Sequence, residues 1–224
     1  DPLLLHFRMM SNNKDIYNKM AKMIKNTISS KLLSIKYNYE FGGQNLGAEP
    51  LKDFMGKIII IVDSSNRTYL DTDLYEFVNL ASNSPFMRVL RYTQDLKNSP
   101  DILELKQFNK TGMSIVLPDL GSGNSNYSFE LAIVRGCQMP AMCFQNFDNE
   151  MENYSYFFAN DESAFVEKPP ALKETIAQLP SPISQNKNLG FQQRCQDIKL
   201  GSLGTKRICT GIPPGGSDGA VGGT

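Results

Sequence analysis

The sequence predicts an α/β fold in which helices flank a parallel sheet. Along residues 1–172, segments with the apolar pattern of strands alternate with segments of helical spacing, which is the order found in parallel α/β folds. The run Lys57–Asp63 supports this prediction, because continuous β-branched residues are typical of a strand covered on both faces. The pattern yields five or six strands, whereas a closed (β/α) barrel needs eight. An open doubly wound sheet and a barrel whose first strands lie upstream of Asp1 therefore both fit the sequence.

The first half of this region begins with a strand and a helix. Leu3–Phe7 has the length of a buried strand, and Ser11 or Asn12 can cap the helix that follows it. The segment Phe86–Tyr92 fits a strand or a helix equally well. Helical spacing is shared by two sets of apolar residues, which are Ile16, Met20, Met23, Ile24 and Ile28 in the first helix and Leu74, Phe77, Val78 and Ala81 in a second.

The second half begins with a helix that starts at Ser99 and Pro100, since proline is favoured at the first helical position. Gly136 is expected to end a later helix from the C′ position. Pro140 interrupts an expected strand, which predicts a bulge or a sheet edge there. The other expected elements are a helix through Ile102, Leu105 and Phe108, strands over Met113–Leu117, Gln138–Phe144 and Ala164–Val166, and helices over Phe129–Arg135 and Glu150–Phe158.

The chain is expected to divide into a folded domain over residues 1–172 and an extended tail over residues 173–224. The regular pattern ends near Lys173, and prolines and glycines become frequent toward the end of the chain. Such a tail has little core of its own. We therefore expect protein partners to bind the tail and to order it.

The composition argues against several classes of protein. The chain has 224 residues, 23 basic and 23 acidic side chains and a formal net charge of zero, whereas general nucleic-acid binders carry a basic surplus. Its longest apolar stretch, Ile58–Val62, is far shorter than the roughly 20 residues of a transmembrane helix, so only peripheral membrane contact is expected. The start of the chain lacks the pattern of a signal peptide. The four cysteines are sparse and lack zinc-site spacing, and we therefore expect free thiols in a reducing compartment.

Three short motifs follow one another between Ser125 and Leu172. They are Ser125-Asn126-Tyr127, the strand Gly-Cys-Gln-Met-Pro-Ala-Met-Cys-Phe-Gln over 136–145, and Ala-Phe-Val-Glu-Lys-Pro over 164–169. Their order and spacing resemble the Y region of the catalytic barrel of phosphoinositide-specific phospholipase C. Weaker similarity to the X region of that family covers Pro2–Arg8 and Leu51–Ile61, so the resemblance spans residues 1–172. The sequence around Asn83–Arg88 is most similar to that of the shortened phospholipase C-like proteins of large DNA viruses.

The resemblance implies a (β/α) barrel of the TIM type and an acid–base attack on a phosphodiester, with two histidines and a calcium ion held by carboxylates. Both histidines of that family lie in strands that would precede Asp1. Where the family places a calcium-binding glutamate, this chain has Arg8, and a cation cannot ligate calcium. The family's phosphate-binding lysines fall at Ile61 and Asp63, and its Arg-Ile-Tyr falls near Ser114–Leu117. The resemblance therefore predicts a degenerate phosphodiesterase without a calcium ion or another cofactor.

The predicted site lies at the carboxyl ends of the strands. His6 and Arg8 are two residues apart on a strand and therefore share a face, which in a barrel is the interior face. Arg8 is predicted to anchor an anion there, with His6, Asp63 and Gln145 as further substrate-binding residues. The alternative is a salt bridge between Arg8 and Asp63 or another carboxylate, which takes the place of the metal. The catalytic residues are not identified by the sequence.

Two functions follow from these observations. The first is a degenerate domain that acts as a structural or binding component of a large virus particle, located in the virion or the host cytoplasm, with capsid proteins as candidate partners. The second is an active phosphodiesterase that cleaves a phosphoinositide or another phosphodiester without a metal. In that case its histidines come from upstream and Arg8 takes the place of calcium. Fold alone does not decide between them, because sites rather than scaffolds carry the chemistry.

Overall fold

The computed structural model describes residues 1–175, 194–199 and 205–210. Contacts divide the chain into two units, Asp1–Thr175, which we call the body, and Ile176–Thr224. The body is an α/β unit with small parallel sheets, as predicted, and its described strands do not close into a barrel. Its strands are β1 (Leu3–Phe7), β2 (Ile58–Asp63), β3 (Leu80–Ser82), β4 (Met87–Arg91), β5 (Met113–Leu117) and β6 (Met139–Pro140), and its helices are α1 (Lys14–Ile28), α2 (Asn38–Phe41), α3 (Ile102–Thr111), α4 (Glu130–Val134) and α5 (Asn149–Asn160).

Sheet A consists of β1, β2 and β3, which lie in that order and run parallel. The register pairs Phe7 of β1 with Val62 of β2, and Asp63 of β2 with Ser82 of β3, so the carboxyl ends of all three strands meet at one edge. All six residues of β2 are buried, as its continuous apolar run predicts.

Sheet B consists of β4, β5 and β6, which are also parallel. The strand predicted over Gln138–Phe144 is shortened to Met139 and Pro140. Pro140 has no N–H to donate, so the ladder with β5 continues through its neighbours: the N–H of Gln138 donates to the carbonyl of Ser114 at 3.2 Å, and that of Ala141 to Val116 at 2.8 Å. The proline is tolerated because β6 is the outer strand of sheet B.

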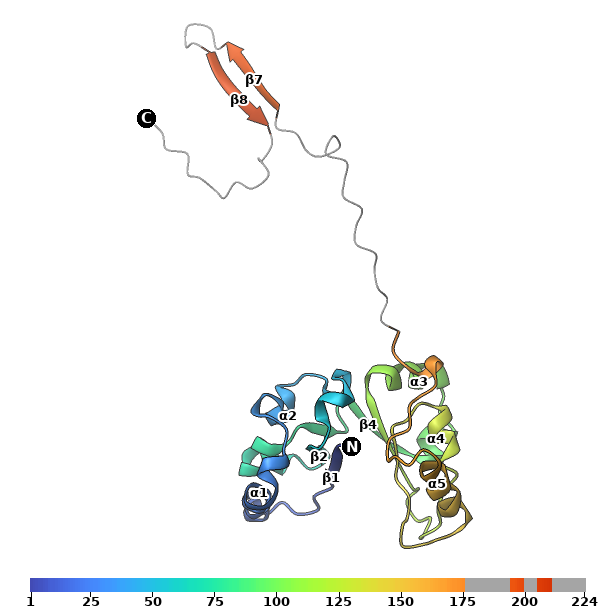
Figure 1. Cartoon of the computed structure of the whole chain (residues 1–224). Coiled ribbons are helices and arrows are strands. Elements are labelled where there is room, and N and C mark those ends of the chain that lie inside the picture. The colour runs from blue at the N-terminus through green and yellow to red at the C-terminus, as the bar shows by residue number, and fades with distance from the viewer. Residues whose placement is uncertain (176–193, 200–204, 211–224) are drawn as a thin grey trace. The chain divides into compact units, whose positions relative to one another are not determined.

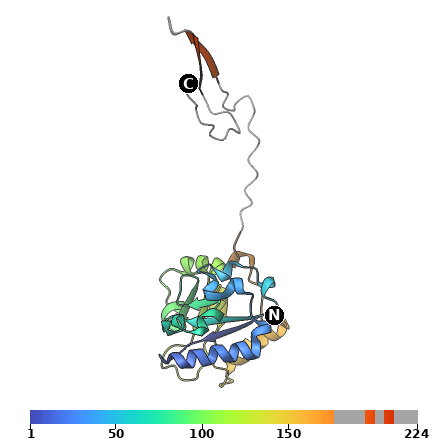
Figure 2. The ribbon, with the colours of Figure 1, turned by 90° about the vertical axis from the view of Figure 1, so that its left-hand side faces the viewer.

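An apolar cluster lies between the two sheets, and helices cover their other faces. Successive side chains of β2 point to opposite faces of sheet A. Ile59 and Ile61 therefore join the central cluster, while Ile60 packs with α1. Figure 1 shows α1 and α2 with the blue-to-cyan first half of the body, and α3, α4 and α5 with the green-to-orange second half. In Figure 2, α1 crosses in front of the strands of sheet A. No helix in the described ranges is long and apolar enough to cross a membrane.

The first helix is capped by neither of the two predicted residues, Ser11 and Asn12, and its predicted apolar stripe is confirmed in part, because Ile24 is buried and Met20 and Ile28 pack against the same cluster. Its N-cap is Asn13, whose side chain accepts a hydrogen bond from the N–H of Asp15 at 3.0 Å. Ile16 and Met23 of the predicted stripe are exposed. The buried residue Tyr17 takes their place, because its hydroxyl donates to the carbonyl of Ser11 at 2.5 Å and so satisfies its polar end.

Three other elements also differ from the predictions, and the structure decides between the two alternatives for a fourth segment. The cap of α3 is Asp101, which accepts from the N–H of Glu104 at 2.8 Å, so Pro100 lies before the helix. The second predicted helix is a 3-10 turn at Asp73–Phe77, and its last apolar residue, Ala81, belongs to β3. The ambiguous segment forms β4, and a π-helical turn at Tyr92–Lys97 follows it. Residues 164–166 form no strand, since they have no partner in a ladder.

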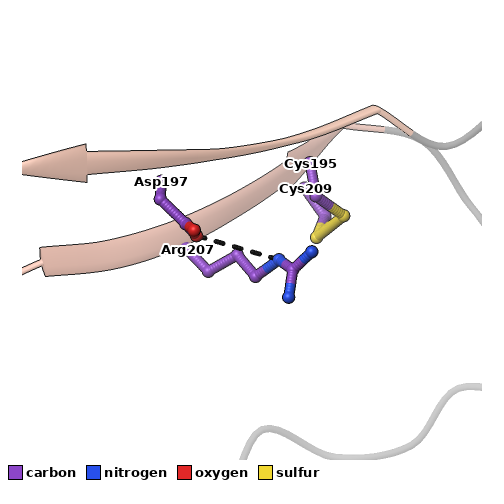
Figure 3. The surroundings of a disulfide bond; sticks show 4 residues. All are labelled: Cys195, Asp197, Arg207 and Cys209. Atoms are coloured by element: carbon purple, nitrogen blue, oxygen red, sulfur yellow. Dashed lines mark ion pairs between the residues drawn. A yellow bond between two sulfur atoms is a disulfide. The ribbon is translucent and has the colours of Figure 1, made fainter.

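The second unit contains a regular element where only an extended tail was predicted. Strands β7 (Arg194–Lys199) and β8 (Thr205–Thr210) form an antiparallel pair, and a disulfide joins Cys195 to Cys209 (Figure 3). The prediction of four free thiols is therefore wrong for these two, whereas Cys137 and Cys143 are free. The remainder of the predicted tail, 176–193, 200–204 and 211–224, lies outside the described residues.

Candidate functional site

Polar side chains gather where the strands of sheet A end. Leu4 of β1 packs in the central apolar cluster, so His6 and Arg8, two and four residues further on, lie on the same side of the chain. His6 Nε2 lies 2.8 Å from Ser82 Oγ at the end of β3. The carboxyl ends of parallel strands are a common place for binding sites, because the strands bring residues from separate segments to one edge.

Asp63 is the centre of this polar group. Its carboxylate is only 6% exposed and accepts hydrogen bonds from Asn83 Nδ2 at 2.7 Å and from the N–H of Ser65 at 2.9 Å. The other carboxylate oxygen lies 3.6 Å from Nε of Arg8. Burial by itself would raise the pKa of Asp63, but the hydrogen bonds from Ser65 and Asn83 and the charge of Arg8 outweigh it and lower that pKa. Asp63 is therefore an ionised carboxylate in which one oxygen accepts two hydrogen bonds and the other faces Arg8.

The loop after β3 adopts an unusual conformation that brings Asn83 to Asp63. Asn83 has a φ of 57°, in the left-handed region that asparagine enters more readily than most residues. Ser64 holds this turn, because its hydroxyl donates to the carbonyl of Ser82 at 2.7 Å and to that of Asn83 at 3.0 Å. This backbone conformation places the side-chain amide of Asn83 where it can donate to the carboxylate of Asp63.

His6 is neutral at physiological pH in this setting. Burial is the largest influence and lowers the pKa of His6, the charge of Asp63 raises it, and the charge of Arg8 lowers it. A neutral imidazole beside a hydroxyl has the geometry of a base and a nucleophile. However, Ser82 is completely buried, so a substrate cannot reach its hydroxyl. The His6–Ser82 contact therefore joins β1 to β3 rather than forming a nucleophilic pair.

The structure brings three of the four predicted site residues together. His6, Arg8 and Asp63 form one electrostatic group, whereas Gln145 is exposed in the loop after β6, where its Nε2 lies 3.5 Å from Asn124 Oδ1. Sequence reasoning missed Ser82 and Asn83, because it placed a helix over the residues that form β3. The polar run that begins at Ser82 is the signal that could have marked a strand end.

The group at the end of sheet A does not fit a calcium ion. Calcium needs six to eight oxygen ligands. Asp63 is the only buried carboxylate among the described residues, and Arg8 already faces it. In the described ranges, no three His, Cys, Asp or Glu side chains come together as metal ligands. The donor set is therefore that of an ion pair with supporting hydrogen bonds.

A cavity of about 470 Å³ lies between the two sheets and below the segment 164–169. Its wall is mainly apolar and includes Leu4, Ile59 and Met113. Three charged side chains also line it: Glu49 accepts from the hydroxyl of Tyr37 at 3.3 Å, Glu167 pairs with Lys173, and Lys168 Nζ donates to the carbonyl of Asn109 at 2.6 Å. The residues of the polar group at the end of sheet A do not line this cavity, so the two are separate features.

The residues that carry the phospholipase C resemblance hold the second half of the body together. Gln138 donates to the carbonyls of Asn109 at 3.0 Å and Gly112 at 2.9 Å, and it accepts from the N–H of Ser114. Asn126 exchanges hydrogen bonds with Cys143, and the buried hydroxyl of Tyr127 donates to the carbonyl of Val116 at 2.9 Å. The polar groups of these side chains form hydrogen bonds within the fold and are therefore not free to bind a substrate.

Among the comparisons with known proteins, only solved structures match this chain, and they show the fold alone. No protein-family model and no curated protein match the sequence. Solved structures that match the fold include PLC21, a phospholipase C, from L. pealei (18% identity, TM-score 0.59) and from S. officinalis (18% identity, TM-score 0.57). Each comparison covers 77% of this chain, and this chain spans only 27% of the length of those two proteins. The chain therefore has a phospholipase C-like fold.

Proposed function

We propose that this chain is a catalytically degenerate phospholipase C-like domain that serves as a structural or binding component. The observation that carries this proposal is the ion pair between Arg8 and Asp63, 3.6 Å apart at the carboxyl edge of sheet A. The family resemblance puts Arg8 where a calcium-binding glutamate would stand. A carboxylate paired with a guanidinium and with two hydrogen-bond donors is neutralised locally and offers no site for a second cation.

The proposed architecture is an incomplete barrel of the TIM type. Sheets A and B provide six parallel strands, and in this proposal further strands of the barrel pair with the edge strands β1 and β6. In this proposal those strands come from a segment upstream of Asp1. The proposed setting remains a large virus particle, with capsid proteins as candidate partners. This setting rests on the sequence resemblance alone.

The test is an assay for phosphodiester cleavage by the full chain. Vesicles containing phosphatidylinositol or its bisphosphate are incubated with the protein, with calcium or with a chelator, and released inositol phosphate is measured. We expect no release above that of buffer in either condition. Release that requires calcium would show that a metal site exists despite the Arg8–Asp63 pair, and the proposal would then be wrong.

A second function is favoured by the exposure of Arg8. Its side chain is 52% exposed although it faces Asp63, so part of the guanidinium is free to bind a phosphate. In this alternative the protein is a metal-independent phosphodiesterase. Turnover that is insensitive to the chelator and lost in Arg8→Gln would support it. Arg67→Gln, which removes an exposed charge from the turn after β2, is the matched control and should leave turnover unchanged.

A further inference from the structure

The hairpin of β7 and β8 has two chemically different faces. Its register pairs Cys195 with Cys209, Asp197 with Arg207 and Lys199 with Thr205, and these three pairs alternate with the others along the ribbon. Because successive side chains of a strand point to opposite faces, the three pairs share one face. Figure 3 shows the disulfide and the Asp197–Arg207 pair on that face.

The disulfide face is stabilised internally. The disulfide closes the hairpin across 14 positions of sequence, and Nε of Arg207 lies 3.8 Å from an oxygen of Asp197. Asp197 is the only acidic residue among the described strand residues of the hairpin, and the ion pair offsets its charge. The acidic charge of the hairpin is thus confined to one face and paired there.

The opposite face combines aliphatic and basic side chains. Ile198 and Ile208 are 42% and 43% exposed, and the register makes them diagonal neighbours on this face. Lys206 lies directly opposite Ile198, and Gln196 lies opposite Ile208. No acidic side chain lies on this face between 195–199 and 205–209. We call it the isoleucine face.

A hairpin of two strands is marginally stable in water without a disulfide or a partner surface. The isoleucine face is about 20 Å long and about 10 Å wide, or roughly 200 Å². A stable protein interface buries about 800 Å² on each partner, so this face alone is too small to form one. Adsorption to a lipid surface requires no such area, because aliphatic side chains enter the interface and basic side chains bind anionic headgroups.

We propose that the isoleucine face binds the surface of an anionic lipid membrane, with Ile198 and Ile208 in the interface and Lys206 at the headgroups. The disulfide keeps the two isoleucines side by side and holds the paired Asp197 away from the negative surface. Binding by one such hairpin is weak and reversible, since it depends on two aliphatic residues and few charges. This inference is independent of whether the body is catalytic.

The test is sedimentation of the full chain with vesicles of phosphatidylcholine, with or without phosphatidylserine, under non-reducing conditions. We expect binding only to vesicles that contain phosphatidylserine. The bound fraction should decrease as the salt concentration is raised. The double substitution Ile198→Ser and Ile208→Ser should weaken binding by about tenfold or more. Lys206→Gln should weaken it by about fivefold. Circular dichroism should show that the body is unchanged in each variant.

Lys199→Gln is the matched control, because it removes the same charge from the disulfide face of the same hairpin. It should weaken binding much less than Lys206→Gln does. Equal effects of the two substitutions would mean that binding is not specific to one face, and the proposal would be wrong. Failure to bind vesicles, together with retention on immobilised polyglutamate, would assign the hairpin to an acidic protein instead. Failure to bind either would also overturn the proposal.

Discussion

Replacing Asn109 with leucine should lower the free energy of unfolding of the body by about 2–6 kcal/mol. Asn109 lies near the end of α3 and is completely buried. Its Nδ2 donates to the carbonyl of Arg135 at 2.9 Å, and its Oδ1 accepts from the hydroxyl of Ser114 at 2.6 Å. Leucine has a similar shape but leaves both partners without a hydrogen bond. Each buried unpaired group costs about 1–3 kcal/mol, and Ser114 has no access to water.

The assay is urea unfolding followed by circular dichroism, since the chain has no tryptophan. The double variant Asn109→Leu with Ser114→Ala removes one orphaned hydroxyl and should recover about 1–2 kcal/mol of the loss. Asn153→Leu, at an exposed position of α5, is the control and should change stability by less than about 0.5 kcal/mol. If Asn109→Leu behaves like this control, the hydrogen bonds around Asn109 do not stabilise the body, and our account of the second half is wrong.

Three further perturbations test the site, a turn at residues 39–41 with left-handed backbone conformation, and the cysteines. Burial lowers the pKa of His6, so the unfolded state binds the proton more readily, and stability should fall as the pH drops below about 6.5. In an NMR titration of this single histidine, Asp63→Asn should lower the pKa further and Arg8→Gln should raise it; shifts of the opposite sign would contradict the arrangement. Tyr69→Phe should cost about 1.5–3 kcal/mol in urea unfolding, because its hydroxyl donates at 2.6 Å to Glu40 in a left-handed turn. Alkylation of the denatured chain should label two cysteines without reductant and four with it, and four labels without reductant would exclude the disulfide.

Strands β1, β2 and β5 were predictable because their sequence signals are strong, whereas β3 and β4 were not. The continuous β-branched run of β2 leaves few alternatives to a strand buried on both faces, and β1 and β5 are short apolar runs of strand length. The burial of Tyr17 in α1 was not predictable from the aliphatic residues alone. Tyr17 looks amphipathic in a sequence, and only the carbonyl of Ser11 within reach of its hydroxyl makes its burial favourable.

The candidate site was predictable in part. Strand alternation and parallel ends place His6, Arg8 and Asp63 together, and both observations can be made in the sequence. Asn83 could not be found in this way, because its contribution depends on a left-handed backbone conformation that the sequence does not specify. The disulfide has a signal in the sequence, because Cys195 and Cys209 lie at the outer ends of two strand-like stretches that a short glycine-containing segment separates.

The fold and the proposed loss of activity depend on different residues, and this separation explains how they can coexist. Gln138 and Lys168, which carry the resemblance, are bound to the carbonyl of Asn109 at the end of α3. Arg8 and Asp63, on which the proposed loss of activity rests, lie at the edge of the other sheet and make no hydrogen bond to that network among those the structure describes. A chain can therefore change the residues of sheet A that would bind a metal while the scaffold around α3 is preserved. For the same reason, the Asn109 variants test only the account of the fold, and only Arg8 and Asp63 variants can test the account of the site.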